Sequence, residues 1–167
     1  MSQEPVWDRF VLRIDIRAPR EAIYRAWSTR AGMEAWFLRE CRYLDRQGNE
    51  IEANFSALTG DRYLFRWHGY PNEVQEEGRV LEENGRDLFV FSFGKAGNCR
   101  VSIANGGELC ILALEQTEIP DDEAGRMNWH VGCKTGWTFY LANLKSLLEG
   151  GIDLRNKDIG LQNMLNA

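Results

Sequence analysis

The sequence predicts an α+β fold in which helices cover one side of an antiparallel sheet. Three observations lead to this prediction: two short amphipathic segments follow a first strand, a long run of strands and turns comes next, and one long helical stripe closes the pattern. Strands joined by tight turns pair antiparallel, and a helix with one apolar face needs a second layer to bury it. The expected order of elements is therefore β-α-α-(β)n-α.

The first strand and the first helix are expected within residues 10–27. Apolar and polar residues alternate at most positions of 10–16, as in a half-buried strand. Ala18 and Pro19 end this strand, and Pro19 suits the first helical position because its missing N–H would have no intrahelical partner there. Apolar residues then recur at three- and four-residue steps across 22–27, which predicts a short amphipathic helix.

A second short helix is expected directly after the first. The pair Ser28-Thr29 supplies a hydroxyl for an N-cap, and the apolar residues that follow it are Met33, Trp36 and Phe37. Two helices in quick succession therefore interrupt a chain that is otherwise rich in strands.

Residues 39–118 read as strands and turns throughout. Aromatic residues line one face of two of these runs, and they are Tyr63, Phe65 and Trp67 in the first and Phe89, Phe91 and Phe93 in the second. Asn84-Gly85 and Asn105-Gly106 lie between strand-like runs, and Asn-Gly is a strong hairpin signal. This pattern predicts an antiparallel meander with an aromatic face.

The last element is a long helix over residues 128–149. Its apolar stripe consists of Trp137, Leu141, Leu144 and Leu148, and His130 and Cys133 extend the stripe backwards. Gly150 and Gly151 follow, as expected just beyond a helix C-terminus. Such a helix is about 30 Å long, which is enough to cross a whole sheet.

Composition excludes several kinds of chemistry. The chain has two histidines and four cysteines without a C-x-x-C pair, so we expect no metal site and no cofactor. A net charge of -5 without a basic patch argues against nucleic-acid binding. The N-terminus does not resemble a secretory signal and no run of eighteen apolar residues occurs, so we expect a cytoplasmic protein that does not insert into membranes.

The chain contains no internal repeat and no stretch with the composition of a linker. We therefore expect one domain over residues 1–156, followed by a short polar tail over 157–167. The tail carries a few apolar residues at loose helical spacing, so both a short packed helix and a frayed end remain open.

Three local segments, in this order, resemble the START-like (SRPBCC) superfamily with its helix-grip fold, in the branch named for the activator of heat-shock protein 90 ATPase. The segments are Ile16-Arg17-Ala18-Pro19 with Ala26-Trp27-Ser28, then Gly32-Met33-Glu34-Ala35-Trp36-Phe37, and finally Gly136-Trp137-Thr138 with Asn143-Leu144-Lys145-Ser146-Leu147-Leu148-Glu149-Gly150-Gly151. The resemblance implies a curved sheet that grips the C-terminal helix, with a ligand cavity between them.

The implied cavity would be walled mainly by aromatic side chains, as small-molecule sites commonly are. The candidate ligand-binding residues are Trp36, Phe37, Trp67, Phe91, Trp129, His130, Cys133, Trp137 and Tyr140. The same aromatic residues could simply fill a core, and both interpretations remain open. Arg66 and Glu115 are candidate charges for the cavity, although charge on a sheet usually faces solvent, and the acidic clusters at 73–77 and 121–123 read as solvated.

His130 and Cys133 are three residues apart on the expected helix, which suggests a base and a nucleophile on one face. No third residue that would orient them stands at a fixed spacing, and a buried thiol is usually inert, so we assign no catalytic residue. We expect His130 either to reach the cavity or to lie partly exposed in the first helical turn.

The favoured function is the binding of a small hydrophobic or amphipathic ligand between the sheet and the long helix, without a committed catalytic activity. Two alternatives remain: a protein-interaction module like the chaperone ATPase activators, and a cavity enzyme of the cyclase, dehydratase or hydrolase kind that uses His130. The sequence contains no counterpart of the activator's N-terminal chaperone-binding domain, which argues against a chaperone partner. A homodimer remains open.

Overall fold

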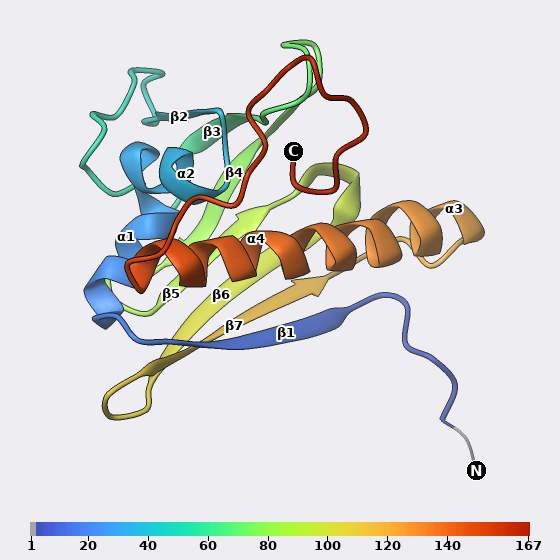
Figure 1. The fold of residues 1–167 in the computed structure, drawn as a ribbon, viewed down its shortest axis with the longest axis horizontal. Helices are drawn as coiled ribbons and strands as arrows, with labels where there is room; N and C mark the ends of the chain where they lie inside the picture. Colours follow the sequence, from blue (N-terminus) through green and yellow to red (C-terminus); the bar gives the residue numbers. More distant parts are fainter. Residues whose placement is uncertain (1–2) are drawn as a thin grey trace.

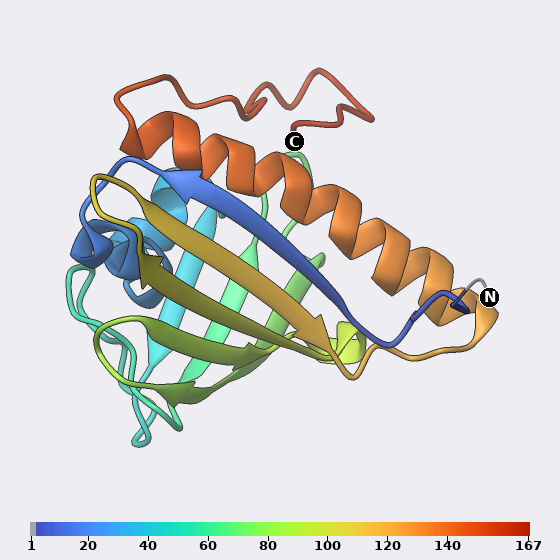
Figure 2. The same ribbon diagram turned by 90° about the horizontal axis from the view of Figure 1, so that it is seen from below.

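Seven antiparallel strands form one curved sheet in the computed structural model, which describes residues 3–167 (Figures 1 and 2). Their order across the sheet is β1-β7-β6-β5-β4-β3-β2. The strands are β1 (Phe10–Ile16), β2 (Glu40–Leu44), β3 (Arg62–Arg66), β4 (Gln75–Glu83), β5 (Leu88–Ser92), β6 (Asn98–Asn105) and β7 (Cys110–Thr117). Consecutive strands from β2 to β7 pair as neighbours, so the meander expected from the sequence is confirmed.

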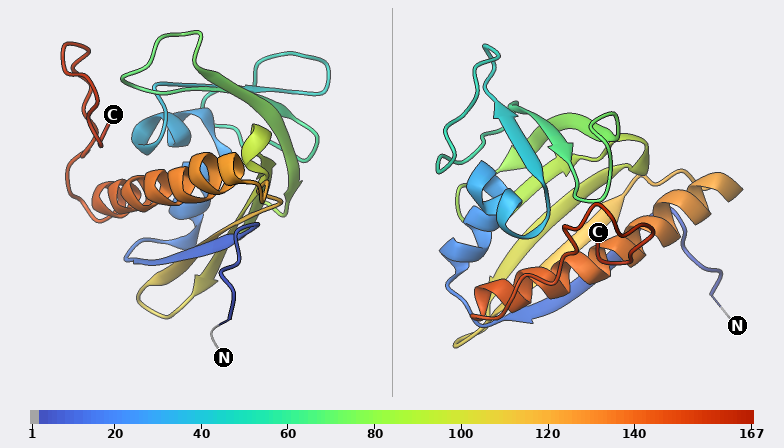
Figure 3. Two further views of the ribbon diagram at one scale, coloured as in Figure 1. Left: turned by 90° about the vertical axis from the view of Figure 1, so that its right-hand side faces the viewer. Right: turned by 45° about the horizontal axis from the view of Figure 1, so that its top comes forward.

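The helices lie on the concave side of this sheet. They are α1 (Arg20–Ser28), α2 (Arg30–Trp36), α3 (Glu123–Gly125) and α4 (Gly132–Leu148), with a π-helical segment (Arg126–Val131) between α3 and α4 and a single 3₁₀ turn (Gly94–Ala96) after β5. Figure 3 shows α4 between the sheet and the C-terminal segment of the chain. The predicted α+β class and helix-grip arrangement are therefore confirmed. No helix within residues 3–167 is long and apolar enough to cross a bilayer.

The N-cap of α2 is the residue expected from the sequence, whereas the N-cap of α1 differs from the expectation. The Thr29 hydroxyl accepts a hydrogen bond from the N–H of Gly32 at 2.9 Å, as an N-cap residue does. Pro19, expected as the first helical residue, is instead the N-cap of α1, because its ψ of 141° is extended rather than helical. Its ring still starts the helix, since proline fixes φ close to the helical value.

The closing helix starts earlier than the sequence predicted. It begins at Glu123 rather than at residue 128, and the carboxylate of Asp122 caps it by accepting from the N–H of Gly125 at 2.7 Å. The acidic cluster at 121–123 is thus partly a helix start rather than only a solvated loop. The π-helical segment that follows has a wider turn than an α-helix, with hydrogen bonds from residue i to residue i+5. The helix then continues as α4 to Leu148.

Aromatic side chains fill most of the space between the sheet and α4. Trp27 packs against Trp36 with ring centroids 4.6 Å apart and against Trp137 at 5.6 Å, while Phe91 and Phe65 approach from the sheet. All five side chains are buried. Large buried aromatic areas contribute strongly to core stability, so this layer holds the helices onto the sheet.

The C-terminal segment has no regular secondary structure but is fastened at both of its ends. Arg155, which is 7% exposed, donates to the carbonyl oxygens that end α2, and it forms an ion pair with Asp153 at 2.8 Å. Further on, the hydroxyl of Tyr140 donates to the main-chain oxygen of Ala167 at 2.7 Å. The segment therefore neither forms a helix nor frays, and it lies against α4 instead (Figure 1).

Candidate functional site

An apolar pocket opens between α4 and the sheet, beside the residues that follow β3 and β5. Its volume is about 110 Å³. Seven residues line it: Phe37, Trp67, Phe93, Cys133, Gly136, Trp137 and Tyr140. Trp36 and Phe91 of the aromatic interior lie behind this pocket and are buried.

Phe37 occupies the centre of the pocket wall. Its ring stacks on Trp137 with centroids 4.8 Å apart, and the edges of Trp67 and Tyr140 meet it at 5.7 Å and 4.9 Å. The chain delivers Phe37 from the C-cap of α2, whereas Trp137 and Tyr140 share one face of α4 at the three-residue spacing of a helix. The site thus depends on the docking of α2 against α4.

A buried carboxamide fixes the position of Trp137. Gln116 is fully buried, and its Oε1 accepts from the indole N–H of Trp137 at 2.9 Å and from the Cys99 thiol at 3.6 Å. Its Nε2 donates to the carbonyl of Ala96 at 2.8 Å. Sequence reasoning missed Gln116, although its place in β7, two residues after the buried Leu114, already put it on the inward face.

Cys133 contributes a neutral thiol to the pocket. Burial raises its pKa, and the negative charge of Glu76 raises it further. A thiol with a raised pKa stays protonated at neutral pH and is a poor nucleophile. Cys133 therefore lines the pocket as a small neutral group.

Glu76 points toward the interior from β4, where it pairs in register with the buried Phe65. Its side chain is half-buried, and burial raises the pKa of its carboxyl group. The acidic cluster at 73–77 was expected to be solvated throughout, so Glu76 is an exception. The alternation of β4 identifies it, because Val80 on the same face is buried.

The structure brings together five of the nine predicted ligand-binding residues at the pocket, namely Phe37, Trp67, Cys133, Trp137 and Tyr140. Trp36 and Phe91 lie behind this wall in the core, and Trp129 packs partly buried against the core without lining the pocket. Phe93 and Gly136 also line the pocket and had not been singled out as ligand-binding residues.

His130 lies outside the pocket. It is 8% exposed, its ring packs between Trp7 and Phe10 at centroid distances of 5.1 Å and 5.4 Å, and its Nδ1 is 2.8 Å from the carbonyl of Trp7. The imidazole therefore fastens the chain before β1 to the closing helix. It faces neither the thiol of Cys133 nor the pocket.

The two candidate cavity charges also lie elsewhere. Arg66 forms an ion pair with Glu40 at 2.8 Å on the outer face of the sheet. Glu115 stands between the buried residues Leu114 and Gln116 in β7, so its side chain lies on the outer face as well. Within residues 3–167, no three His, Cys, Asp or Glu side chains are grouped so that they could hold a metal ion.

A curved antiparallel sheet that grips a long C-terminal helix, with two short helices after the first strand, defines the START-like class of proteins. The match to a family model is more specific. Residues 17–149 match the family described as "Activator of Hsp90 ATPase homolog 1-like protein", and the chain belongs to this family. No curated protein matches the sequence.

Several solved structures share this fold. A crystal structure of a Staphylococcus saprophyticus protein has a TM-score of 0.67 and 16% identity, covering 88% of this chain and 96% of that one. The solution structure of the Aha1 dimer from Colwellia psychrerythraea has a TM-score of 0.67 and 18% identity, covering 86% and 97%. DynU16, described as a protein in the dynemicin biosynthetic locus, has a TM-score of 0.63 and 19% identity, covering 90% and 50%.

Proposed function

We propose that this protein binds a small hydrophobic or amphipathic molecule at the pocket between α4 and the sheet. The supporting observation is the pocket itself, whose wall is formed by five aromatic rings, one thiol and one glycine. Apolar walls with few polar groups are typical of small-molecule sites. The family has the fold in which such a cavity is expected, so the site and the fold point to the same function.

The volume limits what the pocket accepts. Typical ligand sites enclose roughly 300–1,000 Å³, whereas a cavity of roughly 150 Å³ is enough for a molecule such as benzene. A pocket of about 110 Å³ therefore takes one ring or a short branched chain, or the apolar end of a longer molecule. Trp67 and Phe93 are only partly buried and can move aside at the mouth, while Gln116 holds Trp137 in place.

Binding is better supported than catalysis at this site. General acid–base chemistry needs a titratable group within hydrogen-bonding reach of the substrate. Among the residues that line the pocket, only the thiol of Cys133 and the phenol of Tyr140 titrate, and burial raises the pKa of both, that of Tyr140 to about 12. Both side chains therefore act as neutral groups at pH 7.

The test uses two glycines of α4. A Cβ on Gly136 would meet no atom within 4 Å, and Gly136 lines the pocket, so Gly136→Leu occupies part of the space that a ligand would fill. Gly132→Leu is the matched control, because Gly132 is exposed and does not line the pocket. Toluene, phenol and decanoic acid are suitable probes, because each offers one ring or one apolar chain end. Binding is followed by ligand-observed NMR and by the shift in melting temperature that binding to the folded state produces.

We expect Gly136→Leu to weaken the binding of at least one probe by about tenfold or more, while Gly132→Leu binds as the parent does. Equal binding by both variants would contradict the proposal, and so would the absence of any probe signal together with no retained ligand in native mass spectrometry.

Self-association is a second candidate, since the Colwellia psychrerythraea Aha1 of the same fold is described as a dimer. Light scattering on the purified chain tests it, and a monomer mass at high concentration would reject it. Contact with a chaperone, suggested by the family's description, is tested by pull-down with purified Hsp90. The cytoplasmic location and the division into a domain at 1–156 with a tail at 157–167 stay predictions.

A further inference from the structure

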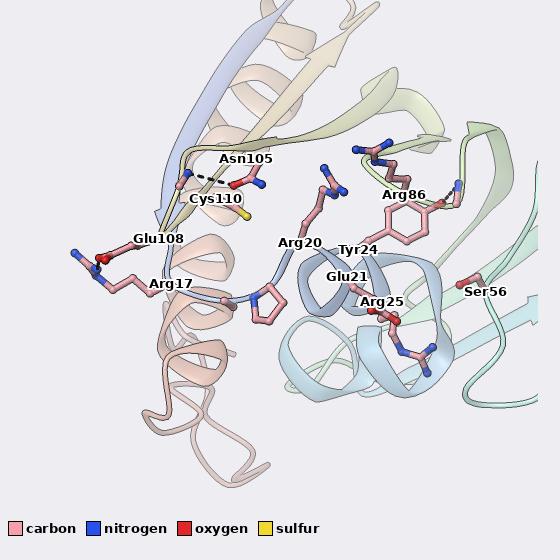
Figure 4. Close-up of a pocket in the computed structure, with 14 residues that line it drawn as sticks. Arg17, Arg20, Glu21, Tyr24, Arg25, Ser56, Arg86, Asn105, Glu108 and Cys110 are labelled. Atoms are coloured by element: carbon pink, nitrogen blue, oxygen red, sulfur yellow. Dashed lines mark hydrogen bonds and ion pairs between the residues drawn. The ribbon is translucent and has the colours of Figure 1, made fainter.

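A second and larger hollow lies where the start of α1 meets two hairpin turns (Figure 4). Its volume is about 820 Å³, and it shares no lining residue with the aromatic pocket. Its walls come from residues 17–25, from the turn between β4 and β5 at Gly85 and Arg86, and from the turn between β6 and β7 at 105–110. Neither the sequence reasoning nor the proposed function uses this hollow.

The charge of this hollow is opposite to that of the whole chain. Four arginines and two glutamates line it, whereas the chain has a net charge of -5. The four arginines are Arg17, Arg20, Arg25 and Arg86. Arg17 has the carboxylate of Glu108 at 3.9 Å, and Arg25 donates to the carbonyl oxygen of Asn54 at 3.1 Å, so the positive charge available to an anion comes from Arg20 and Arg86.

Two of these arginines extend into the hollow. Figure 4 shows Arg20 reaching from the start of α1 toward the turn that carries Arg86, while Arg17 and Arg25 point away at the rim. Within residues 3–167, the guanidinium of Arg20 forms neither a hydrogen bond nor an ion pair. Arg86 has one carboxylate nearby, that of Asp87, at the long distance of 3.8 Å. Both side chains therefore keep most of their donors available.

Tyr24 adds a buried neutral phenol to the wall of the hollow. It is 4% exposed, and its hydroxyl oxygen accepts from the N–H of Gly85 at 3.1 Å. No residue in the described part of the chain accepts the hydroxyl proton of Tyr24. Burial raises the pKa of Tyr24 to about 12, so this proton stays in place at neutral pH. The phenol of Tyr24 is therefore a neutral hydroxyl in the wall of the hollow, held beside Gly85.

We propose that this hollow binds the phosphate group of a small phosphorylated molecule. The guanidinium groups of Arg20 and Arg86 would hold the phosphate oxygens through paired N–H donors, a geometry that arginine provides and lysine does not. The Tyr24 hydroxyl would donate to a third oxygen. The volume leaves room for an organic group beyond the phosphate, and this group could belong either to a free metabolite or to the headgroup of a phospholipid.

The first experiment is a titration of the labelled protein with inorganic pyrophosphate, followed by amide NMR at constant ionic strength. Constant ionic strength is needed because salt screens exposed charges. We expect shifts at Gly85, Arg86, Gly107 and the first turn of α1, and no comparable shifts when sodium chloride replaces pyrophosphate. The variants Arg20→Glu and Arg86→Glu should each weaken binding by about tenfold or more.

Arg13→Glu is the matched control, because it makes the same change of charge at an exposed position of β1 outside the hollow. A second arm measures sedimentation with vesicles of phosphatidylcholine alone and with added phosphatidic acid. Binding to pyrophosphate but not to vesicles supports a free phosphorylated molecule, and binding to phosphatidic acid vesicles that Arg20→Glu abolishes supports a lipid headgroup. No binding in either arm, or equal losses for Arg13→Glu and Arg20→Glu, would overturn the proposal.

Discussion

The indole N–H of Trp137 donates to the buried carboxamide of Gln116, so a polar bond inside the core connects α4 to β7. The oxygen of Gln116 also accepts from Cys99 on β6 and its nitrogen donates to Ala96, which leaves this carboxamide fully used. One side chain therefore holds the rear wall of the aromatic pocket against two strands and the 3₁₀ turn.

Gln116→Leu should destabilise the protein strongly, although the two side chains are similar in size. The substitution leaves the indole N–H of Trp137 and the carbonyl of Ala96 without partners in the core, at about 1–3 kcal/mol for each unpaired group. Urea unfolding measures the change in the free energy of unfolding. Gln47→Leu on an exposed turn is the control and should change it little. A loss below about 0.5 kcal/mol for Gln116→Leu would show that the carboxamide is not important for stability.

Arg155→Ala should release the C-terminal segment. Arg155 donates to the carbonyls of Leu38, Glu34 and Ala35, and Asp153 would lose its buried partner. Each carbonyl oxygen left without a donor inside the protein costs about 1–3 kcal/mol, while Asp153 keeps its ion pair with Lys157 at 2.9 Å. We expect faster proteolysis after residue 155 and a lower melting temperature.

Lys157→Ala provides the comparison for Arg155→Ala, since Lys157 also pairs with Asp153 but is half-exposed. It should leave both proteolysis and melting temperature nearly unchanged. If the two variants behaved alike, the anchoring role of Arg155 would have to be abandoned.

Glu76→Gln should change the pH dependence of stability. Burial raises the pKa of Glu76 above its ordinary value of 4.5 in the folded state, so the folded protein holds this proton more tightly than the unfolded chain does. The folded state therefore loses stability as the pH rises from 4.5 through the folded pKa. The carboxamide that replaces the carboxyl group cannot ionise, so the variant should melt above the parent at neutral pH and converge with it in acid.

Melting curves between about pH 3 and pH 8 test this prediction. Glu73→Gln, at an exposed position of the same acidic cluster, is the control and should follow the parent. A second readout is the thiol of Cys133, whose pKa should fall once the charge of Glu76 is gone. A thiol titration curve identical to that of the parent would contradict the placement of Glu76 near Cys133.

Gly32→Ala should weaken the junction of α1 and α2. A Cβ at residue 32 would collide with the main-chain oxygen of Arg25 and approach the Cα of Ala26 to 2.7 Å, and neither backbone atom can move aside cheaply. We expect a loss of about 1–3 kcal/mol, as for other overpacked sites. Gly136→Ala meets open space and should instead stabilise α4 slightly, by up to about 1 kcal/mol. Thermal unfolding of the two variants side by side distinguishes them.

Much of the fold could be predicted from periodicity. Alternation identified the inward faces of the strands, and the three- and four-residue steps identified α1 and α4. The structure places Phe37, Trp67 and Trp137 at one pocket, and their role in binding a ligand stays a prediction. Gln116 and Glu76 were missed because a polar residue in a strand is ordinarily read as outward-facing. However, Leu114 lies two residues before Gln116 and Val80 lies four residues after Glu76, so each shares a strand face with the polar residue. Both Leu114 and Val80 are buried, which indicates that Gln116 and Glu76 face inward as well.

His130 could not be placed from the sequence for a different reason. The backward extension of the α4 stripe assumes one constant helical period, but the residues from Arg126 to Val131 form a π-helical turn with i→i+5 hydrogen bonds. Because of this wider turn, the residues before Gly132 face a different direction around the helix axis than a regular α-helix would give them. Nothing in the spacing of His130 and Cys133 reports this shift, because it depends on how the turn packs against Trp7 and Phe10.

This π-helical turn also suggests how related chains could change their binding walls. Deleting one residue between Arg126 and Val131 would restore a regular α-helix, in which residues three apart lie on one face. The imidazole at the position of His130 would then move relative to the thiol of Cys133, with no substitution at either position. The length of one helical turn therefore sets which way the side chain at this position faces, independently of residue identity.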